Sequence, residues 1–135
     1  MIPQKHLLTF NVVSCQFALH YSFETETKAR QALQNISLAL AKGGHFFGTC
    51  PNSNWIVYVF DTDDRKKLRS IQGLHFGNAV YSITFDQKDE YPLFGHRYRF
   101  DLMDAIDDCP EYLIHFPTLV KHVFFNTHTQ TSKRI

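Results

Sequence analysis

The sequence predicts an α/β fold with an added antiparallel β-hairpin, and a few stretches of the chain carry that prediction. A nearly continuous apolar run at residues 7–19 is followed by a periodic helical stretch after Thr25 and by a second apolar run at residues 45–49. Strand, helix and strand joined by short connections form a parallel crossover unit, which is the building block of α/β folds. Two alternating stretches, residues 79–85 and 94–101, predict the antiparallel hairpin.

The first apolar run, at residues 7–19, has apolar side chains on both sides of its alternation, among them Val12, Val13 and Phe17. That pattern is typical of a strand buried on both faces of a sheet. We therefore expect neighbouring elements on both of its faces.

The helix between the two strands is predicted from its spacing and its ends. Thr25 can cap the amino end, because its hydroxyl can accept from an unpaired backbone amide. Lys42, Gly43 and Gly44 predict the carboxyl end, since glycine readily takes the left-handed cap conformation. The apolar positions recur at spacings of four, three and four residues, at Ala29, Leu33, Ile36 and Leu40.

The rest of the chain predicts smaller elements. Residues 55–60 are apolar and predict the start of a helix, whereas residues 61–69 carry mixed charges and predict a surface insert. Pro117 suits the first turn of a last helix. Residues 125–135 lack apolar periodicity and predict a disordered tail.

The composition limits the classes of function. A chain of 135 residues is long enough for one domain, and no apolar run approaches the length that spans a bilayer, so we do not expect a membrane protein. A net charge of +1 excludes a strong overall attraction for nucleic acid, so any RNA contact needs a local site. The odd and widely spaced cysteines, Cys15, Cys50 and Cys109, predict a reducing, intracellular compartment.

Motifs of phosphate and metal chemistry are absent from the sequence. The glycines stand at positions 43, 44, 48, 73, 77 and 95, a spacing that contains no dinucleotide-binding fingerprint and no P-loop. Asp101, Asp104, Asp107 and Asp108 could be considered a Mg²⁺ site, but Mg²⁺ usually takes only one or two carboxylates. We interpret them as a solvated helix or turn face and predict no metal site.

Five stretches of the chain carry a family resemblance. They are SCQFALHYSF at 14–23, KGGHFFGTCPNS at 42–53, FGNAVYSITF at 76–85, YPLFGHRYRFDL at 91–102 and DDCPEYLIHFP at 107–117. In this order and spacing they resemble the eukaryotic mRNA cap guanine-N7 methyltransferases over most of residues 11–120. The resemblance implies a partial Rossmann-like S-adenosylmethionine-dependent methyltransferase fold with an inserted antiparallel β-hairpin on the cap side.

The same resemblance implies a partial catalytic domain over residues 1–124, because the family's glycine-rich loop and its ribose-binding acidic residue come before the matched part. The implied reaction transfers a methyl group from S-adenosyl-L-methionine to N7 of the 5′ cap guanine of mRNA. The alternative is a truncated, inactive remnant that binds RNA or protein weakly. The implied partners are capped mRNA (the GpppN end) and the RNA polymerase II-associated capping machinery in the nucleus, with no membrane and no metal.

The chemistry explains why no catalytic acid or base stands out. N7 of guanine has a free lone pair and attacks the sulfonium methyl without first losing a proton. Rate then depends on holding donor and acceptor at attack distance and on a field that tolerates the new positive charge. We expect binding residues and no catalytic dyad.

The resemblance also suggests site residues. Gln16 and Tyr21 are expected to contact the cofactor, because ligands of open α/β sheets bind at the carboxyl ends of strands. His20 is expected beside the guanine, and Glu111, in the turn CPEYL, is expected to accept from the guanine Watson–Crick edge. From the sequence alone, the ordinary interpretations are a strand-end amide, a core tyrosine, a packed histidine and a solvated glutamate.

Arg97 and Arg99 leave one further alternative open. Both could touch the triphosphate or RNA, since arginine forms bidentate bonds with phosphate. A solvated outer strand face is the interpretation that the alternation favours.

Overall fold

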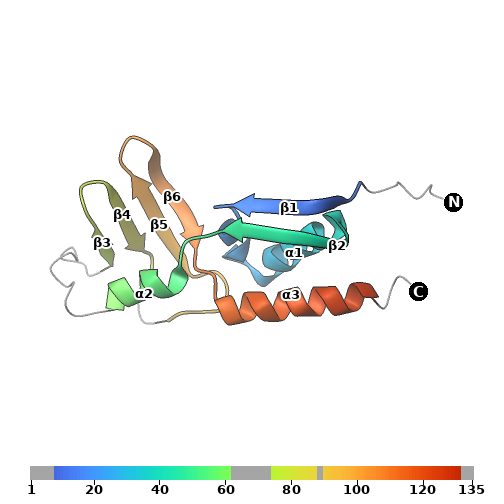
Figure 1. Ribbon diagram of the computed structural model, residues 1–135. Helices are drawn as coiled ribbons and strands as arrows, with labels where there is room; N and C mark the ends of the chain where they lie inside the picture. Colours follow the sequence, from blue (N-terminus) through green and yellow to red (C-terminus); the bar gives the residue numbers. More distant parts are fainter. Residues whose placement is uncertain (1–7, 62–73, 88–89, 132–135) are drawn as a thin grey trace.

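The computed structural model describes residues 8–61, 74–87 and 90–131. These residues form a two-stranded parallel sheet and a four-stranded antiparallel sheet, with helices packed against them (Figure 1). The α/β class is therefore confirmed. In chain order the elements are β1 (Phe10–Gln16), the 3₁₀ helix η1 (Leu19–Glu24), α1 (Glu26–Ala39), β2 (Leu40–Thr49), α2 (Ser53–Asp61), β3 (His75–Gly77), β4 (Tyr81–Phe85), β5 (Arg97–Leu102), β6 (Ile106–Tyr112) and α3 (Phe116–Thr131).

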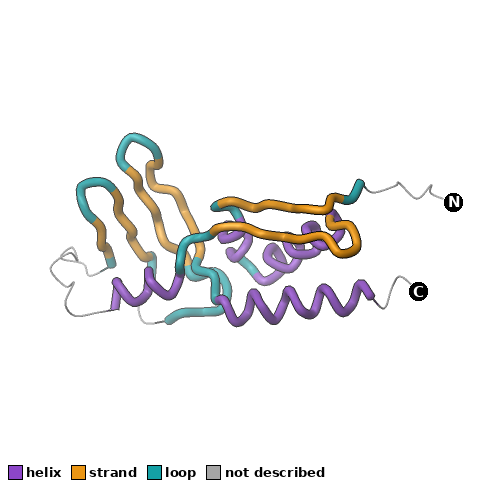
Figure 2. Tube along the Cα trace, viewed as in Figure 1, coloured by secondary structure: helices purple, strands orange, loops and turns teal. Residues whose placement is uncertain are grey.

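The first part of the chain is the predicted parallel crossover unit. β1 and β2 pair in parallel, and α1 connects them and contacts both strands. Thr25 caps α1, since its Oγ1 accepts from the backbone N of Lys28 at 3.2 Å. Figure 2 shows α1 on one side of the two strands, and α3 packs against α1. The predicted strand, helix and strand are confirmed.

The predicted boundary between helix and second strand is wrong. α1 ends at Ala39, and Leu40 already has extended dihedral angles (φ −81°, ψ 133°). Leu40 pairs with Phe10, and the register then moves on to the pair of Val12 with His45. The strand begins early because this pairing is available, and the glycines lie in the irregular segment between the two pairs, where Gly43 takes φ 79°.

The prediction that the first strand is buried on both faces is also wrong. Val12 on β1 and Phe47 on β2 are each 55% exposed, whereas Cys15 and Phe46 pack against the core beside α1. In the described part of the chain this sheet has two strands and helices on one face only (Figure 1). The opposite face is therefore bare.

The second sheet extends the predicted hairpin. β4 and β5 pair antiparallel as predicted, and β3 and β6 add a strand at each edge. Glu111 lies in β6, so the prediction that CPEYL forms a turn is wrong. Pro110 is compatible with this strand because β6 is an edge strand, where a missing backbone N–H need not interrupt the ladder.

Two hydrophobic clusters hold these parts together. One lies between α2 and the inner face of the four-stranded sheet and includes Phe60, Phe76 and Phe85. The other lies under η1 and α1 and includes Phe23 and Ile114. β6 and η1 contact each other, so the carboxyl end of the parallel sheet faces the antiparallel one (Figure 1).

The remaining predictions concern the helices and the chain end. The helix predicted from residue 55 is α2, and Pro117 stands in the first turn of α3, as predicted. The predicted surface insert lies outside the described residues from residue 62 onward. α3 runs to Thr131, and residues 132–135 lie outside the described part. The disordered tail expected from residue 125 stays a prediction.

Candidate functional site

The site forms where the chain leaves β1. Phe17 follows the strand with a positive φ of 46°, and its backbone N donates to Thr49 O at 2.9 Å. A positive φ costs energy for a bulky residue, and such strain is often found at binding sites. The turn exposes 63% of Phe17 and leads directly into η1.

A cavity of about 430 Å³ lies between η1, α2 and the inner face of the four-stranded sheet. Its polar wall includes Tyr21, Tyr98 and Glu111. An apolar cavity with a few convergent polar groups is the usual form of a small-ligand site. The apolar wall includes Phe17, Trp55, Ile56, Ile83, Phe100 and Ile106.

Glu111 is the centre of the polar wall, and it is only 6% exposed. Tyr98 Oη donates to Glu111 Oε2 at 2.6 Å, and Tyr21 Oη donates to Oε1 at 3.4 Å. His20 Nε2 lies 3.3 Å from the same Oε1, an ion-pair distance without hydrogen-bond alignment. A buried carboxylate needs such donors, because it has lost most of its water.

These contacts decide the charge of the carboxyl group. Burial by itself would raise the pKa of Glu111, but the contacts from His20, Tyr98 and Tyr21 outweigh it, and the pKa is lowered. Glu111 is therefore ionised at neutral pH. The pKa of Tyr98 is raised by burial and by its bond to Glu111, so Tyr98 keeps the proton that it donates.

Three of the four residues suggested by the resemblance come together here. The rings of His20 and Tyr21 lie 4.3 Å apart, and both side chains contact Glu111. Tyr21 is 41% exposed and lines the cavity, and its pKa is raised by its contact with Cys109, by burial and by the charge of Glu111. His20 is 2% exposed and lies behind the lining residues.

Gln16 lies apart from the other three. It ends β1, as predicted, and its side chain is exposed on the strand. Its Oε1 accepts from Thr49 Oγ1 at 2.8 Å, and its Nε2 donates to Ser14 Oγ at 2.8 Å. Gln16 is not among the side chains that line the cavity.

The sequence reasoning missed Tyr98 and Trp55 as parts of the site. Tyr98 and Glu111 are directly paired in the register of β5 and β6. Treating CPEYL as a strand would have been a first step, but the pair follows only from the register, because side chains opposite each other on one face of a sheet are neighbours. Trp55 follows Pro51 and Asn52 in an apolar helix start, and no sequence signal separates it from a core residue.

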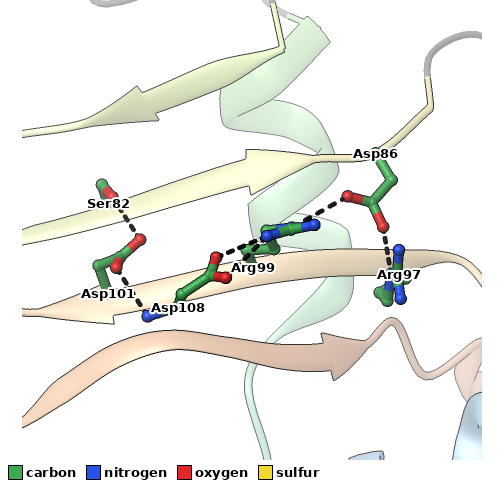
Figure 3. Close-up of polar contacts among 6 residues, drawn as sticks. All are labelled: Ser82, Asp86, Arg97, Arg99, Asp101 and Asp108. Atoms are coloured by element: carbon green, nitrogen blue, oxygen red, sulfur yellow. Dashed lines mark hydrogen bonds and ion pairs between the residues drawn. The ribbon is translucent and has the colours of Figure 1, made fainter.

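The outer face of the same sheet carries the two arginines. Arg97 and Arg99 both contact Asp86, and Arg99 Nη1 donates to Asp108 Oδ2 at 2.7 Å (Figure 3). Asp101 accepts from Ser82 Oγ at 3.1 Å and from Asp108 N at 2.9 Å.

This arrangement bears on the RNA alternative. These three carboxylates and two guanidiniums together carry a net charge of −1, which does not favour the phosphates of RNA. The exposed side chains of Arg97 and Arg99 agree with the predicted solvated strand face.

Three of the four aspartates predicted on a solvated helix or turn face lie instead on strands, Asp101 on β5 and Asp107 and Asp108 on β6. Only Asp104 of the four is in the connecting turn, with φ 61°. In residues 8–61, 74–87 and 90–131, no group of three histidine, cysteine or acidic side chains could hold a metal ion. None of the helices described is long and apolar enough to cross a membrane.

Comparisons with known proteins show which family the chain resembles. A family model described as the mRNA (guanine-N(7))-methyltransferase domain matches residues 2–124. The chain is 46% identical over 113 residues to mRNA cap guanine-N(7) methyltransferase 1 of Oryza sativa subsp. japonica, covering 79% of this chain and 28% of the relative. It is 44% identical over 116 residues to mRNA cap guanine-N(7) methyltransferase of Saccharomyces cerevisiae, covering 81% of this chain and 26% of the relative. It is also 44% identical over 117 residues to mRNA cap guanine-N(7) methyltransferase of Drosophila melanogaster, covering 84% of this chain and 25% of the relative. The chain therefore spans about a quarter of the length of these relatives.

Proposed function

The chain belongs to the mRNA (guanine-N(7))-methyltransferase family, and on that premise we propose that it carries the guanine-binding part of a cap methyltransferase. The reaction is transfer of a methyl group from S-adenosylmethionine to N7 of the cap guanine, on a Rossmann-like sheet of which β1 and β2 are two strands. The observation that carries the proposal is the ionised, buried Glu111 on the wall of an apolar cavity.

A carboxylate in this position suits guanine. The Watson–Crick edge of guanine offers an N1–H and an N2 amino group, both of them donors, and an ionised carboxylate only accepts. Adenine lacks the N1–H donor. The negative charge of Glu111 also attracts the ring as methylation makes it cationic, and this attraction is stronger in an apolar cavity than in water.

The cofactor supplies the reactive methyl group. Gln16 stands at the carboxyl end of β1, where open α/β sheets bind ligands, and its amide offers both a donor and an acceptor. Tyr21 presents an aromatic ring and a hydroxyl on the cavity wall, on the helical turn that follows β1. Both residues fit the two ends of a ligand with polar and apolar parts, and we keep them as the cofactor contacts.

The residues around the cavity then act by position and charge. Glu111 orients the base, and His20 contacts Glu111 from behind the wall. No proton has to leave N7 before the attack, so the proposal assigns no acid or base. Capped mRNA is the partner that this chemistry requires, and contact with the RNA polymerase II-associated capping machinery and a nuclear location remain predictions from the resemblance.

Calorimetric titration of the 135-residue chain with the cap dinucleotide GpppG, and separately with S-adenosylmethionine, tests the proposal. We expect saturable binding of GpppG that Glu111→Gln removes. Asp108→Asn is the matched control, because it neutralises a carboxylate on the outer face of the same strand. Absence of binding by the unaltered chain to either ligand would overturn the proposal and leave the inactive remnant as the better description.

A further inference from the structure

Tyr98 is the second residue of β5, and it is 1% exposed. The ring packs in the core between α2 and the sheet, with its centroid 6.0 Å from that of Phe85. Because the surrounding core fixes the ring, the hydroxyl group has a defined position. That position is 2.6 Å from Glu111 Oε2, directly across the β5–β6 register.

The two oxygens of Glu111 therefore have different partners. Oε2 takes part in a short bond with a buried phenol, which is the strong, charge-assisted kind. Among the residues that the structure describes, Oε1 has the longer contacts from Tyr21, at 3.4 Å, and His20, at 3.3 Å. Long contacts of this kind are weak, so a ligand donor could replace them at little cost.

We propose that Tyr98 is a positioning residue for guanine recognition: its hydroxyl holds Oε2 of Glu111, which leaves Oε1, on the side of Tyr21, to accept from the base. This inference rests on the proposed function of Glu111 in cap binding. It goes further by assigning the selectivity for guanine to a pair of residues: Glu111 accepts from the base, and Tyr98, with its hydroxyl committed to Glu111, acts through the carboxylate.

The same bond keeps the carboxyl group in the form that guanine needs. A protonated Glu111 would present its own donor to a base edge that consists of donors. The titratable groups that face Glu111 are His20 and Tyr21 of η1 and Tyr98 of β5, and Cys109 contacts Tyr21 from β6. Among the three groups that contact the carboxyl, only Tyr98 makes the short hydrogen bond.

The first experiment needs no ligand. The carboxyl carbon of Glu111 is followed by NMR against pH in the 135-residue chain and in Tyr98→Phe, which keeps the ring and removes the hydroxyl. We expect the pKa of Glu111 to be below 4.5 in the unaltered chain and to move upward in the variant. Tyr58→Phe, which removes the hydroxyl of a tyrosine 63% exposed on α2, is the matched control and should leave this pKa unchanged. An unchanged titration of Glu111 in Tyr98→Phe would overturn the inference.

The second experiment measures selectivity. Binding of GpppG and of ApppA is compared in the unaltered chain, Tyr98→Phe, Glu111→Gln and the double variant. We expect Tyr98→Phe to reduce the preference for GpppG roughly tenfold and to make it more sensitive to acid. Glu111→Gln and the double variant should both fail to bind GpppG, since the substitution of Tyr98 acts through the carboxylate. A merely structural role would lower the melting temperature without shifting the preference or its pH profile.

The outcomes of the two experiments are distinguishable. If the unaltered chain does not bind GpppG, the proposed function fails, and the titration of Glu111 still decides whether Tyr98 controls the carboxyl group. If GpppG binds and Glu111→Gln removes binding while Tyr98→Phe retains the full preference, the cap site stands and the role of Tyr98 is overturned.

Discussion

The two faces of the four-stranded sheet carry similar polar pairs in opposite surroundings. On the inner face, Tyr98 and Glu111 are 1% and 6% exposed, and Tyr98 Oη lies 2.6 Å from Glu111 Oε2. On the outer face of the same two strands, Arg99 and Asp108 lie 2.7 Å apart with side chains that are 44% and 58% exposed. The distances are nearly equal, so the difference between the pairs comes from their burial.

Burial changes what each pair can do. Water competes with an exposed ion pair and screens it, so such pairs contribute little to stability. A buried carboxylate has lost its water and needs hydrogen-bond donors from the protein. A ligand that brings donors of its own can therefore bind to it strongly. The inner pair therefore has the burial that the proposed recognition site requires, whereas the outer pairs form a solvated surface.

The largest expected effect is on the inner face, where Phe85→Ala should lower the free energy of unfolding by about 3–5 kcal/mol. Phe85 is 1% exposed and packs against Phe60 and Tyr98, so truncation leaves a cavity in the core. Urea denaturation measures the change. Thr84→Ala, on the outer side of the same strand, is the control, and an equal loss in both variants would contradict the distinction between the faces.

Removing the buried carboxylate should have the next largest effect. Glu111→Ala leaves the hydroxyl of Tyr98 without its acceptor, and we expect a loss of about 1.5–3 kcal/mol in urea denaturation. The sequence alone suggested a solvated glutamate, for which almost no loss is expected. A stability equal to that of the unaltered chain would therefore support the sequence-based interpretation over the structure.

A smaller effect is expected from His96, also on the buried side. Its ring is 1% exposed, stacks on Tyr91 at 4.9 Å and meets Phe85 edge-on at 5.2 Å. Burial lowers the pKa of His96, although the backbone of Glu90 and the charge of Asp86 oppose the shift.

The sign of the resulting pH dependence follows from the lowered pKa. Below the usual histidine pKa of about 6.5, the unfolded chain binds a proton that the folded chain takes up only at lower pH. The contribution of neutral His96 to the free energy of unfolding should be fully present above that pH and should decline as the pH falls below it. His96→Phe should flatten this part of the curve in denaturation experiments between about pH 7 and 5. An unchanged slope in the variant would assign the decline to other groups.

The smallest effect is expected on the outer face. Asp108→Asn removes the charge that pairs with Arg99, and the urea midpoint should stay within experimental error of the unaltered chain. The same measurement in high salt is the control, since screening should make the two chains still more alike. A loss as large as that of Glu111→Ala would show that burial does not separate the two pairs.

Sequence patterns within single elements correctly predicted the helix after Thr25 and the strand around Ile83. The spacing of Ala29 and Leu33 and the cap at Thr25 lie within one helix, and the alternation around Ile83 lies within one strand. These patterns follow from the period of each element and need no knowledge of distant residues. Residues His20, Tyr21 and Glu111 came from the resemblance, which supplied long-range information that periodicity does not contain.

The errors have a common physical origin in long-range pairing. Pro110 is a turn signal in the local sequence, and only the position of β6 at the sheet edge makes it compatible with a strand. The bond from Tyr98 to Glu111 depends on the register between two strands. The exposure of Val12 depends on whether other elements cover that face of β1, and its apolar pattern is the same in either case.

The most direct test of the account follows the carboxyl signal of Glu111 by NMR while GpppG, and then ApppA, is added to the chain. We expect a saturable change in this signal with GpppG and a much smaller one with ApppA, because only guanine brings the N1–H donor. Equal changes with both dinucleotides, or no change with GpppG, would contradict the claim that this buried carboxylate recognises the cap guanine.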